Sequence, residues 1–132
     1  MDEERLRKLP LFESLSKRER RQVAQHADDV DVAEGRHLVE KGAFPYEFYV
    51  IEEGTAEVRD GDERIAELGP GDFFGESALL EHVTRNASVV AATSMRVVVM
   101  TAQDFRGMAR DLPAVAEQIR GAADERYRSL PA

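Results

Sequence analysis

A short stretch near the middle of the chain carries residue types that could bind an anion. Residues 68–80 read Leu-Gly-Pro-Gly-Asp-Phe-Phe-Gly-Glu-Ser-Ala-Leu-Leu, and a single arginine, Arg85, follows them. Pro70 and Gly71 favour a tight turn, and Gly75 allows the backbone to come close to another group. The residues after Gly75 have helical character, and the start of a helical turn presents unpaired N–H groups that attract anions.

Two charged side chains in this stretch suit two parts of one ligand. Arg85, nine residues after Glu76, can return across the site and form charge-assisted hydrogen bonds to a phosphate. Glu76 would repel a phosphate, but its carboxylate can accept a hydrogen bond from a ribose hydroxyl. Together the residues describe a site for a ribose whose phosphate is folded back on it.

These residues resemble the phosphate-binding cassette of cyclic nucleotide-binding domains. The family pattern F-G-E-x-A-L-L…R-x-A-[ST] is similar to Phe74–Leu80 followed by Arg85–Ser88. Lys41–Gly54 resembles the earlier family segment E-G-D-x-G-D-x-F-Y-V-I-x-x-G, and Asp104-Phe105 resembles the start of the family's closing helices. The resemblance covers roughly residues 11–119. It implies a regulatory domain that binds cyclic AMP or cyclic GMP and signals to an attached domain or partner.

The resemblance also implies a role for each cassette residue. Arg85 would pair with the exocyclic phosphate oxygens. Gly75 and Glu76 would hold the ribose 2′-hydroxyl, and the N–H groups of Ser77 and Ala78 would complete the phosphate cradle. We therefore expect a cyclic nucleotide as the ligand, cyclic AMP by family habit, and no further cofactor.

The chain departs from the family pattern at several positions. Thr84 precedes the arginine where proline is common, and in the earlier loop Ala43 stands where aspartate is usual and Pro45 where glycine is usual. Asn86 follows the arginine, and its polar side chain could reach either purine. The choice between cyclic AMP and cyclic GMP is therefore open at the level of the residues.

The order of elements predicts a mainly β fold with flanking helices. Up to about residue 28 the chain reads as helical, with an interruption at Pro10 and a capping box formed by Ser16 and Glu19. From about 29 to 101 the pattern is that of short strands, expected at Val30–Val32, His37–Val39, Phe48–Ile51, Ala56–Val58, Ile65–Leu68, Val89–Ala91 and Arg96–Met100. Short strands at such spacing favour a sandwich or barrel. The resemblance specifies an eight-stranded jelly-roll barrel within a single domain, residues 1–132.

The last part of the chain, from about 102 to 130, reads as two helices. Thr101 can cap the first, and Pro113 begins the second, whose apolar side includes Val115 and Ile119. That side needs a partner, which could be the barrel, a second copy of the chain or both. By resemblance we expect this helix to fold over the base as a lid, with Ile119 as the candidate lid residue and signalling by a population shift. A homodimer through the helix is left open.

Composition narrows the classes of partner. A formal charge of −8 over 132 residues disfavours binding to DNA. The basic cluster Lys17, Arg18, Arg20 and Arg21 is interpreted as a solvated helix face. The chain lacks cysteine, a long apolar run and an apolar leader, so disulfides, a membrane span and a secretory signal are not expected. We expect a cytoplasmic protein.

Catalysis is not expected. His26, His37 and His82 are scattered without metal-ligand spacing, and Glu76 with Glu81 makes a poor acid–base pair. Two alternatives remain beside the nucleotide receptor. One is an interaction module that kept the barrel and lost the ligand, and the other is a small metal-dependent barrel enzyme.

Overall fold

The computed structural model describes residues 1–42, 47–75 and 87–129, the last eight of these without their side chains. The helices are α1 (Glu3–Arg7), α2 (Lys17–Gln25), α4 (Ala102–Asp111) and α5 (Pro113–Ser129). The strands are β1 (Asp28–Val32), β2 (His37–Val39), β3 (Glu47–Glu53), β4 (Ala56–Asp60), β5 (Glu63–Leu68), β6 (Phe73–Phe74), β7 (Ser88–Ala91) and β8 (Met95–Thr101). None of these helices is long and apolar enough to cross a membrane, judged over the described residues.

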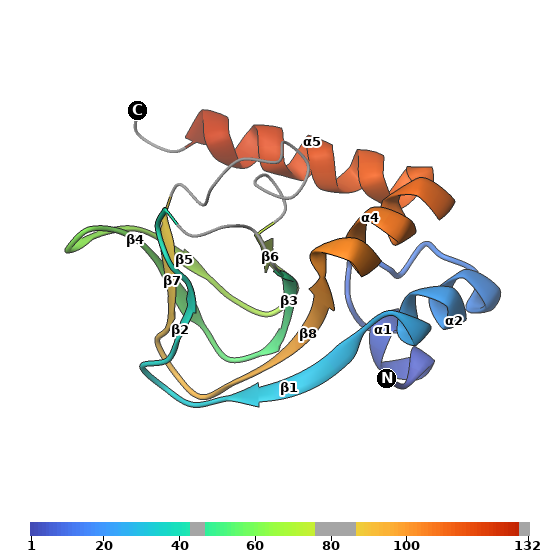
Figure 1. Ribbon diagram of the computed structural model, residues 1–132, viewed down its shortest axis with the longest axis horizontal. Helices are drawn as coiled ribbons and strands as arrows, with labels where there is room; N and C mark the ends of the chain where they lie inside the picture. The colour runs from blue at the N-terminus through green and yellow to red at the C-terminus, as the bar shows by residue number, and fades with distance from the viewer. Residues whose placement is uncertain (43–46, 76–86, 130–132) are drawn as a thin grey trace.

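Within the described residues, the strands form two four-stranded antiparallel sheets (Figure 1). The order in the first sheet is β1-β8-β3-β6, and the order in the second is β2-β7-β4-β5. Apart from β4 and β5, neighbouring strands come from distant parts of the chain, as in a jelly roll. The predicted mainly β fold with flanking helices is confirmed. A hairpin joins β4 to β5, with Gly61 in its turn at a φ of 63°.

The central strands of the first sheet, β3 and β8, are buried on both faces. On β3, Tyr49 and Ile51 point toward the second sheet, whereas Phe48 and Val50 point toward the helices. Because successive side chains of a strand point to opposite faces, a strand covered on both sides reads as an unbroken apolar run. This explains why apolar and polar residues do not alternate in Phe48–Ile51 and Val97–Met100.

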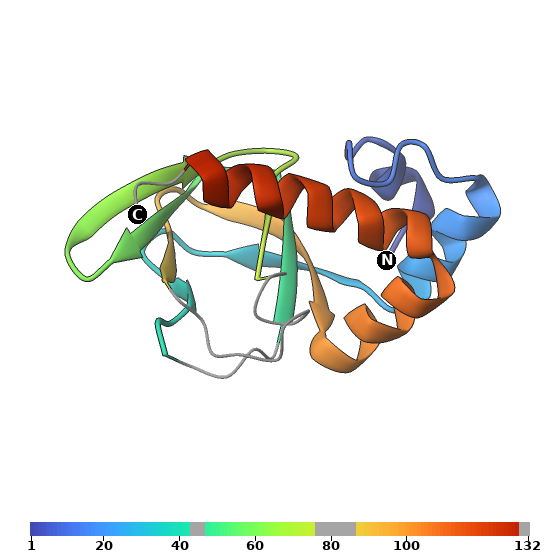
Figure 2. The same cartoon turned by 90° about the horizontal axis from the view of Figure 1, so that it is seen from above.

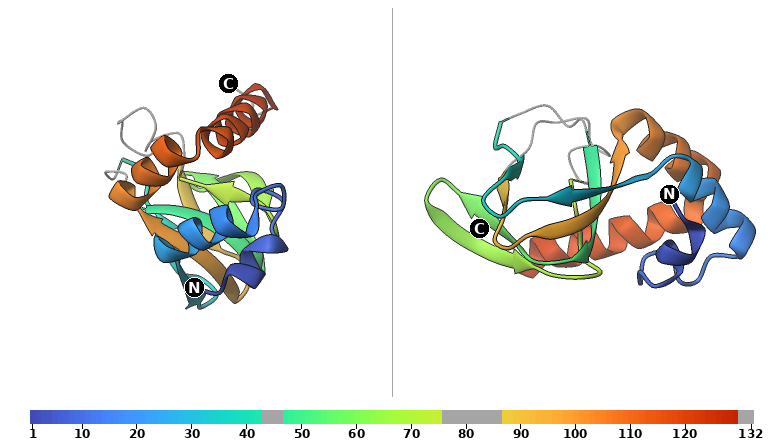
Figure 3. Two further views of the ribbon diagram at one scale, coloured as in Figure 1. Left: turned by 90° about the vertical axis from the view of Figure 1, so that its right-hand side faces the viewer. Right: turned by 90° about the horizontal axis from the view of Figure 1, so that it is seen from below.

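Two hydrophobic clusters follow from this arrangement. The inter-sheet cluster contains Val32, Val39, Tyr49, Ile51, Ala56, Leu68, Phe74, Val89, Ala91, Met95 and Val97. The helix-side cluster contains Leu6, Leu9, Leu11, Phe12, Leu15, Val23, Ala24, Ala27, Phe48, Val50, Phe73, Val98, Met100, Phe105, Met108, Leu112, Val115 and Ile119. The N-terminal helices thus cover one side of the first sheet, together with α4 and the start of α5 (Figures 2 and 3).

The helix ends predicted from the sequence are confirmed. Ser16 and Glu19 form both hydrogen bonds of a capping box at the start of α2. The Thr101 hydroxyl accepts a hydrogen bond from the Asp104 backbone N–H at 3.1 Å and caps α4. Pro113 is the first residue of α5, a position where its missing N–H costs nothing.

The prediction that Arg20 belongs to a solvated basic face is wrong. Arg20 is only 8% exposed, and its Nε donates to Glu3 Oε1 at 2.7 Å. Its Nη1 donates to the Leu15 carbonyl at 2.5 Å. Lys17, Arg18 and Arg21 are exposed, as expected. Arg20 differs from them because it faces α1, so its charge joins the two N-terminal helices.

Candidate functional site

The predicted cassette begins where β6 ends. Phe74 pairs with Tyr49 and Phe73 pairs with Val50, so β6 is the edge strand of the first sheet. Gly75 follows at a φ of 91°, in the left-handed region that favours glycine. The chain therefore leaves the first sheet through a backbone conformation at Gly75 that other residues adopt only with strain.

A compact turn holds the entry to β6. The Gly69 N–H donates to Asp72 Oδ2 at 2.8 Å, and the Asp72 N–H donates to the Gly69 carbonyl at 3.0 Å. Ile51 on β3 fixes the same turn, since it accepts from the Gly71 N–H and donates to the Asp72 carbonyl, each at 2.8 Å. Asp72 thus stabilises the turn that leads into β6, a role that the sequence Gly-Pro-Gly-Asp alone did not reveal.

The two phenylalanines of β6 anchor it on opposite sides. The Phe74 ring stacks on Tyr49 in the inter-sheet cluster, with centroids 4.8 Å apart and planes 16° apart. Phe73 lies in the helix-side cluster, 5.9 Å from the Phe48 ring. Both side chains are buried, and together they fix the backbone immediately before Gly75.

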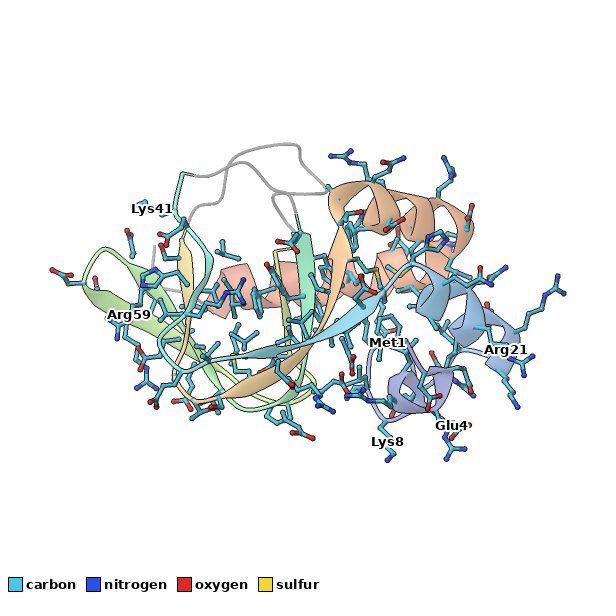
Figure 4. The ribbon with its side chains drawn as sticks, turned by 60° about the horizontal axis from the view of Figure 1, so that its bottom comes forward. Met1, Glu4, Lys8, Arg21, Lys41 and Arg59 are labelled. Carbon is cyan, nitrogen blue, oxygen red and sulfur yellow. The ribbon has the colours of Figure 1, made fainter. Side chains whose placement is uncertain are left out.

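The predicted cassette ends at the start of β7, in the other sheet. Ser88 pairs with Arg59 on β4. The Ser88 hydroxyl accepts a hydrogen bond from the Lys41 backbone N–H at 3.0 Å, and the Lys41 ammonium pairs with Asp60. Figure 4 shows Lys41 and Arg59 on the side of the molecule opposite the labelled residues of the N-terminal helices.

Most of the predicted site residues lie outside the described residues. These are Glu76, Ser77, Ala78, Arg85 and Asn86, and the family departures at Ala43, Pro45 and Thr84 fall there too. Gly75 is placed, at the end of β6. The described flanks show that the chain leaves one sheet at Gly75 and enters the other at Ser88.

Ile119, the candidate lid residue, is buried in the helix-side cluster. It is 0% exposed, and Val115, one turn earlier on α5, is 1% exposed. The first half of α5 therefore packs against the other helices, while the helix as a whole runs over one side of the two sheets (Figure 1).

A separate cavity lies beside the turn that precedes β6. It has a volume of about 430 Å³ and is lined by Arg5, Lys8, Leu9, Pro10, Glu52, Glu53, Pro70, Gly71 and Arg96. Arg5 pairs with Asp29 and Glu52, and Arg96 pairs with Asp31 at 3.0 Å. The hydrogen bond that Arg96 donates to Asp31 raises the pKa of Arg96 above its ordinary value, with a further contribution from the Asp31 charge. Both arginines of this cavity thus already have carboxylate partners.

Each of the two described histidines lies beside a single carboxylate. His26 Nδ1 lies 3.1 Å from Asp104 Oδ1, and His37 Nδ1 lies 2.8 Å from Glu40 Oε1. Across the parts of the chain that the structure describes, no three His, Cys, Asp or Glu side chains are grouped to hold a metal ion.

Comparison with known proteins identifies the family. The family described as "Cyclic nucleotide-binding domain" matches residues 29–111. The chain belongs to this family, and the predicted resemblance is confirmed. Its fold agrees with the regulatory subunit of a cAMP-independent protein kinase A from Trypanosoma brucei. That structure gives a TM-score of 0.83 at 26% identity, over 96% of this chain and 47% of the other.

Curated relatives point to a regulatory role. The chain is 35% identical over 119 residues to a cAMP-dependent protein kinase regulatory subunit of Mycosarcoma maydis, covering 83% of this chain and 23% of that protein. It is 33% identical over 126 residues to the corresponding subunit of Schizosaccharomyces pombe, covering 92% of this chain and 31% of that protein. The chain thus spans less than a third of either relative. Both are named as regulatory subunits, in agreement with the prediction of a non-catalytic domain.

Proposed function

We propose that this chain is a single regulatory domain, residues 1–132, that binds a cyclic nucleotide, with cyclic AMP preferred. One observation carries the proposal. The described chain leaves the first sheet at Gly75, in a left-handed conformation, and enters the second sheet at Ser88. Between those fixed points the sequence supplies Glu76 and Arg85, the two charged groups that a ribose phosphate requires.

The residue roles in this proposal follow the chemistry of the ligand. Arg85 pairs with the phosphate, and the N–H groups of Ser77 and Ala78 complete the cradle. Glu76 accepts a hydrogen bond from the ribose 2′-hydroxyl, beside the close backbone approach of Gly75. Asn86 lies next to Arg85 in the chain, where it can contact the ligand.

We extend the proposal to signalling through α4 and α5. Phe73, three residues before Glu76, belongs to the same cluster as Phe105 of α4 and Ile119 of α5. The Phe48 ring connects them, since its centroid lies 5.9 Å from Phe73 and 4.5 Å from Phe105. A shift of β6 on ligand binding would therefore be felt by both helices, because close-packed interiors transmit strain. In the ligand-bound state Ile119 would leave this cluster if it acts as the lid.

A second candidate function is an interaction module that does not respond to cyclic AMP. The similar structure from Trypanosoma brucei is the regulatory subunit of a cAMP-independent protein kinase A, so the fold does not fix the ligand. In either case the output passes to an attached domain or to a partner protein.

Thermal unfolding with cyclic AMP, cyclic GMP and linear AMP separates these functions. A ligand that binds only the folded chain adds about 2.7 kcal/mol of stability at a hundredfold excess over its Kd. We expect a rise of several degrees in Tm with cyclic AMP and little change with linear AMP. No rise with any nucleotide would favour the interaction module.

The ribose contact has its own test. Glu76→Gln should weaken cyclic AMP binding, and the loss should be smaller for 2′-deoxy cyclic AMP, which lacks the hydroxyl that Glu76 accepts from. Equal losses for the two ligands would contradict the role given to Glu76.

A further inference from the structure

A side-chain hydrogen bond joins the C-terminal end of the cassette to the segment that follows β2. Ser88 Oγ accepts from the Lys41 backbone N–H at 3.0 Å, and the two residues lie 47 positions apart in the chain. Ser88 is the third residue after Arg85. A hydrogen bond that fixes Ser88 therefore also fixes the position at which the segment that carries Arg85 joins β7.

The sheet ladder cannot provide this restraint on the β2 side. β2 and β7 pair at His37↔Val90 and Val39↔Val89, with a shift of register between them, and β2 ends at Val39. Beyond that point the bond from Lys41 to the Ser88 hydroxyl continues the contact between the two segments. On the other side Ser88 is held by its pairing with Arg59.

The partner of Ser88 is itself held in place. The Lys41 ammonium pairs with Asp60, the last residue of β4, and Gly42 follows in a left-handed turn at a φ of 85°. Both charged side chains are about half exposed, 54% and 52%, so the ion pair adds little energy. It is the backbone N–H of Lys41, presented by the turn, that reaches Ser88.

We propose that Ser88 is a positioning residue for nucleotide binding, which rests on the function proposed above. Its hydroxyl holds the C-terminal end of the cassette against the Lys41–Gly42 turn. The segment that carries Arg85 is thereby attached to the sheet at a fixed point before the ligand binds. Pre-positioning reduces the ordering that binding would otherwise require, and so it increases affinity without any contact to the ligand.

The test compares nucleotide affinity with amide exchange at Lys41 in matched variants. Ser88→Ala should weaken cyclic AMP binding by about three- to tenfold, the effect of one hydrogen bond. In the ligand-free protein, Ser88→Ala should also speed hydrogen exchange at the Lys41 amide. A general loss of stability would instead speed exchange at many residues. Ser88→Thr, which keeps the hydroxyl, should restore both.

Two controls separate this bond from other effects. Ser94→Ala changes an exposed serine in the turn between β7 and β8 and should change affinity by about twofold or less. Lys41→Ala keeps the backbone N–H and should change affinity by about twofold or less, because the ion pair with Asp60 is exposed.

The outcomes distinguish the two proposals. Unaltered affinity in Ser88→Ala, when the parent chain binds cyclic AMP, would overturn the role of Ser88 alone. A loss in Lys41→Ala as large as that in Ser88→Ala would also overturn it, since the ammonium would then be the important group. Failure of the parent chain to bind any cyclic nucleotide would overturn the proposed function and this inference together.

Discussion

The rings of Tyr49 and Phe74 stack across β3 and β6, with centroids 4.8 Å apart and planes 16° apart. The Tyr49 hydroxyl donates to Glu47 Oε1 at 3.0 Å and lies 3.4 Å from the Leu38 carbonyl of β2. Tyr49 therefore connects the two sheets and fixes the strand that precedes Gly75.

The stacked ring is expected to matter more than its hydroxyl. Tyr49→Phe keeps the stacking and should lower the free energy of unfolding by about 1 kcal/mol, the value of a typical hydrogen bond. Tyr49→Leu removes the stacking and leaves a poorly filled site, so it should cost about 2–4 kcal/mol. Urea unfolding of both variants measures the difference. Equal losses would show that the hydroxyl, not the ring, holds β6.

Arg20 and Arg21 offer a direct comparison of a buried and an exposed arginine. Arg20→Ala leaves Glu3 and the Leu15 carbonyl without their donor in a site where Arg20 is 8% exposed. It should lower the free energy of unfolding by about 3 kcal/mol, because an unpaired buried charge remains. Arg21→Ala, at the exposed neighbour, should change it by about 0.5 kcal/mol or less. Denaturant unfolding decides, and similar effects in the two variants would contradict the structure.

Two glycines separate backbone strain from steric conflict. Gly54 and Gly35 have nearly the same φ, 88° and 87°. A Cβ at Gly54 would lie 2.4 Å from the Ser94 carbonyl oxygen, whereas a Cβ at Gly35 meets nothing within 4 Å. Gly35→Ala should cost about 1–2 kcal/mol, the strain of the left-handed conformation.

Gly54→Ala should cost clearly more than Gly35→Ala, because the β7–β8 turn must move as well. The Tm of the two variants provides the measurement. A smaller loss at Gly54 than at Gly35 would mean that the turn around Ser94 yields easily.

The capping box of α2 should be sensitive to acid. The backbone N–H of Ser16 donates to the Glu19 carboxylate, and this bond, followed by the bond with the Ser16 side chain, holds the pKa of Glu19 below its ordinary value. A folded-state pKa below the unfolded one stabilises the protein above the unfolded value, about 4.3 for Glu. That stabilisation is lost as the pH falls through the lowered pKa of the folded state.

Glu19→Gln provides the measurement of this effect. The difference in free energy of unfolding between the parent and Glu19→Gln should be constant above about pH 5 and shrink as the pH falls below the ordinary pKa of Glu, about 4.3. Glu13→Gln is the control, because Glu13 is exposed and takes no part in the capping box. A difference for Glu19→Gln that does not change with pH would contradict the role of its charge.

Local interactions made several elements predictable from the sequence. The capping box joins Ser16 to Glu19, and Thr101 caps through Asp104, so each signal lies within four residues. The hairpin at Gly61 is equally local. Strand runs such as Phe48–Ile51 were recognisable because their side chains are apolar and favour strands.

The features that the sequence did not predict depend on distant partners. β6 has only two residues and is defined by pairing with Tyr49 and Val50. Arg20 looks like its neighbours until Glu3, seventeen positions away, is placed beside it. The site follows the same rule, since its motif was readable while the Lys41–Ser88 bond, across 47 positions, was not.

Calorimetric titration with cyclic AMP tests the central claim most directly. The parent chain should bind one cyclic AMP per chain, and Arg85→Ala should bind at least about tenfold more weakly, because a hydrogen bond to a charged group is lost. Arg64→Ala is the matched control, since Arg64 is exposed and pairs with Glu67, and it should bind as the parent does. No binding by the parent, or equal affinity in Arg85→Ala, would contradict the account.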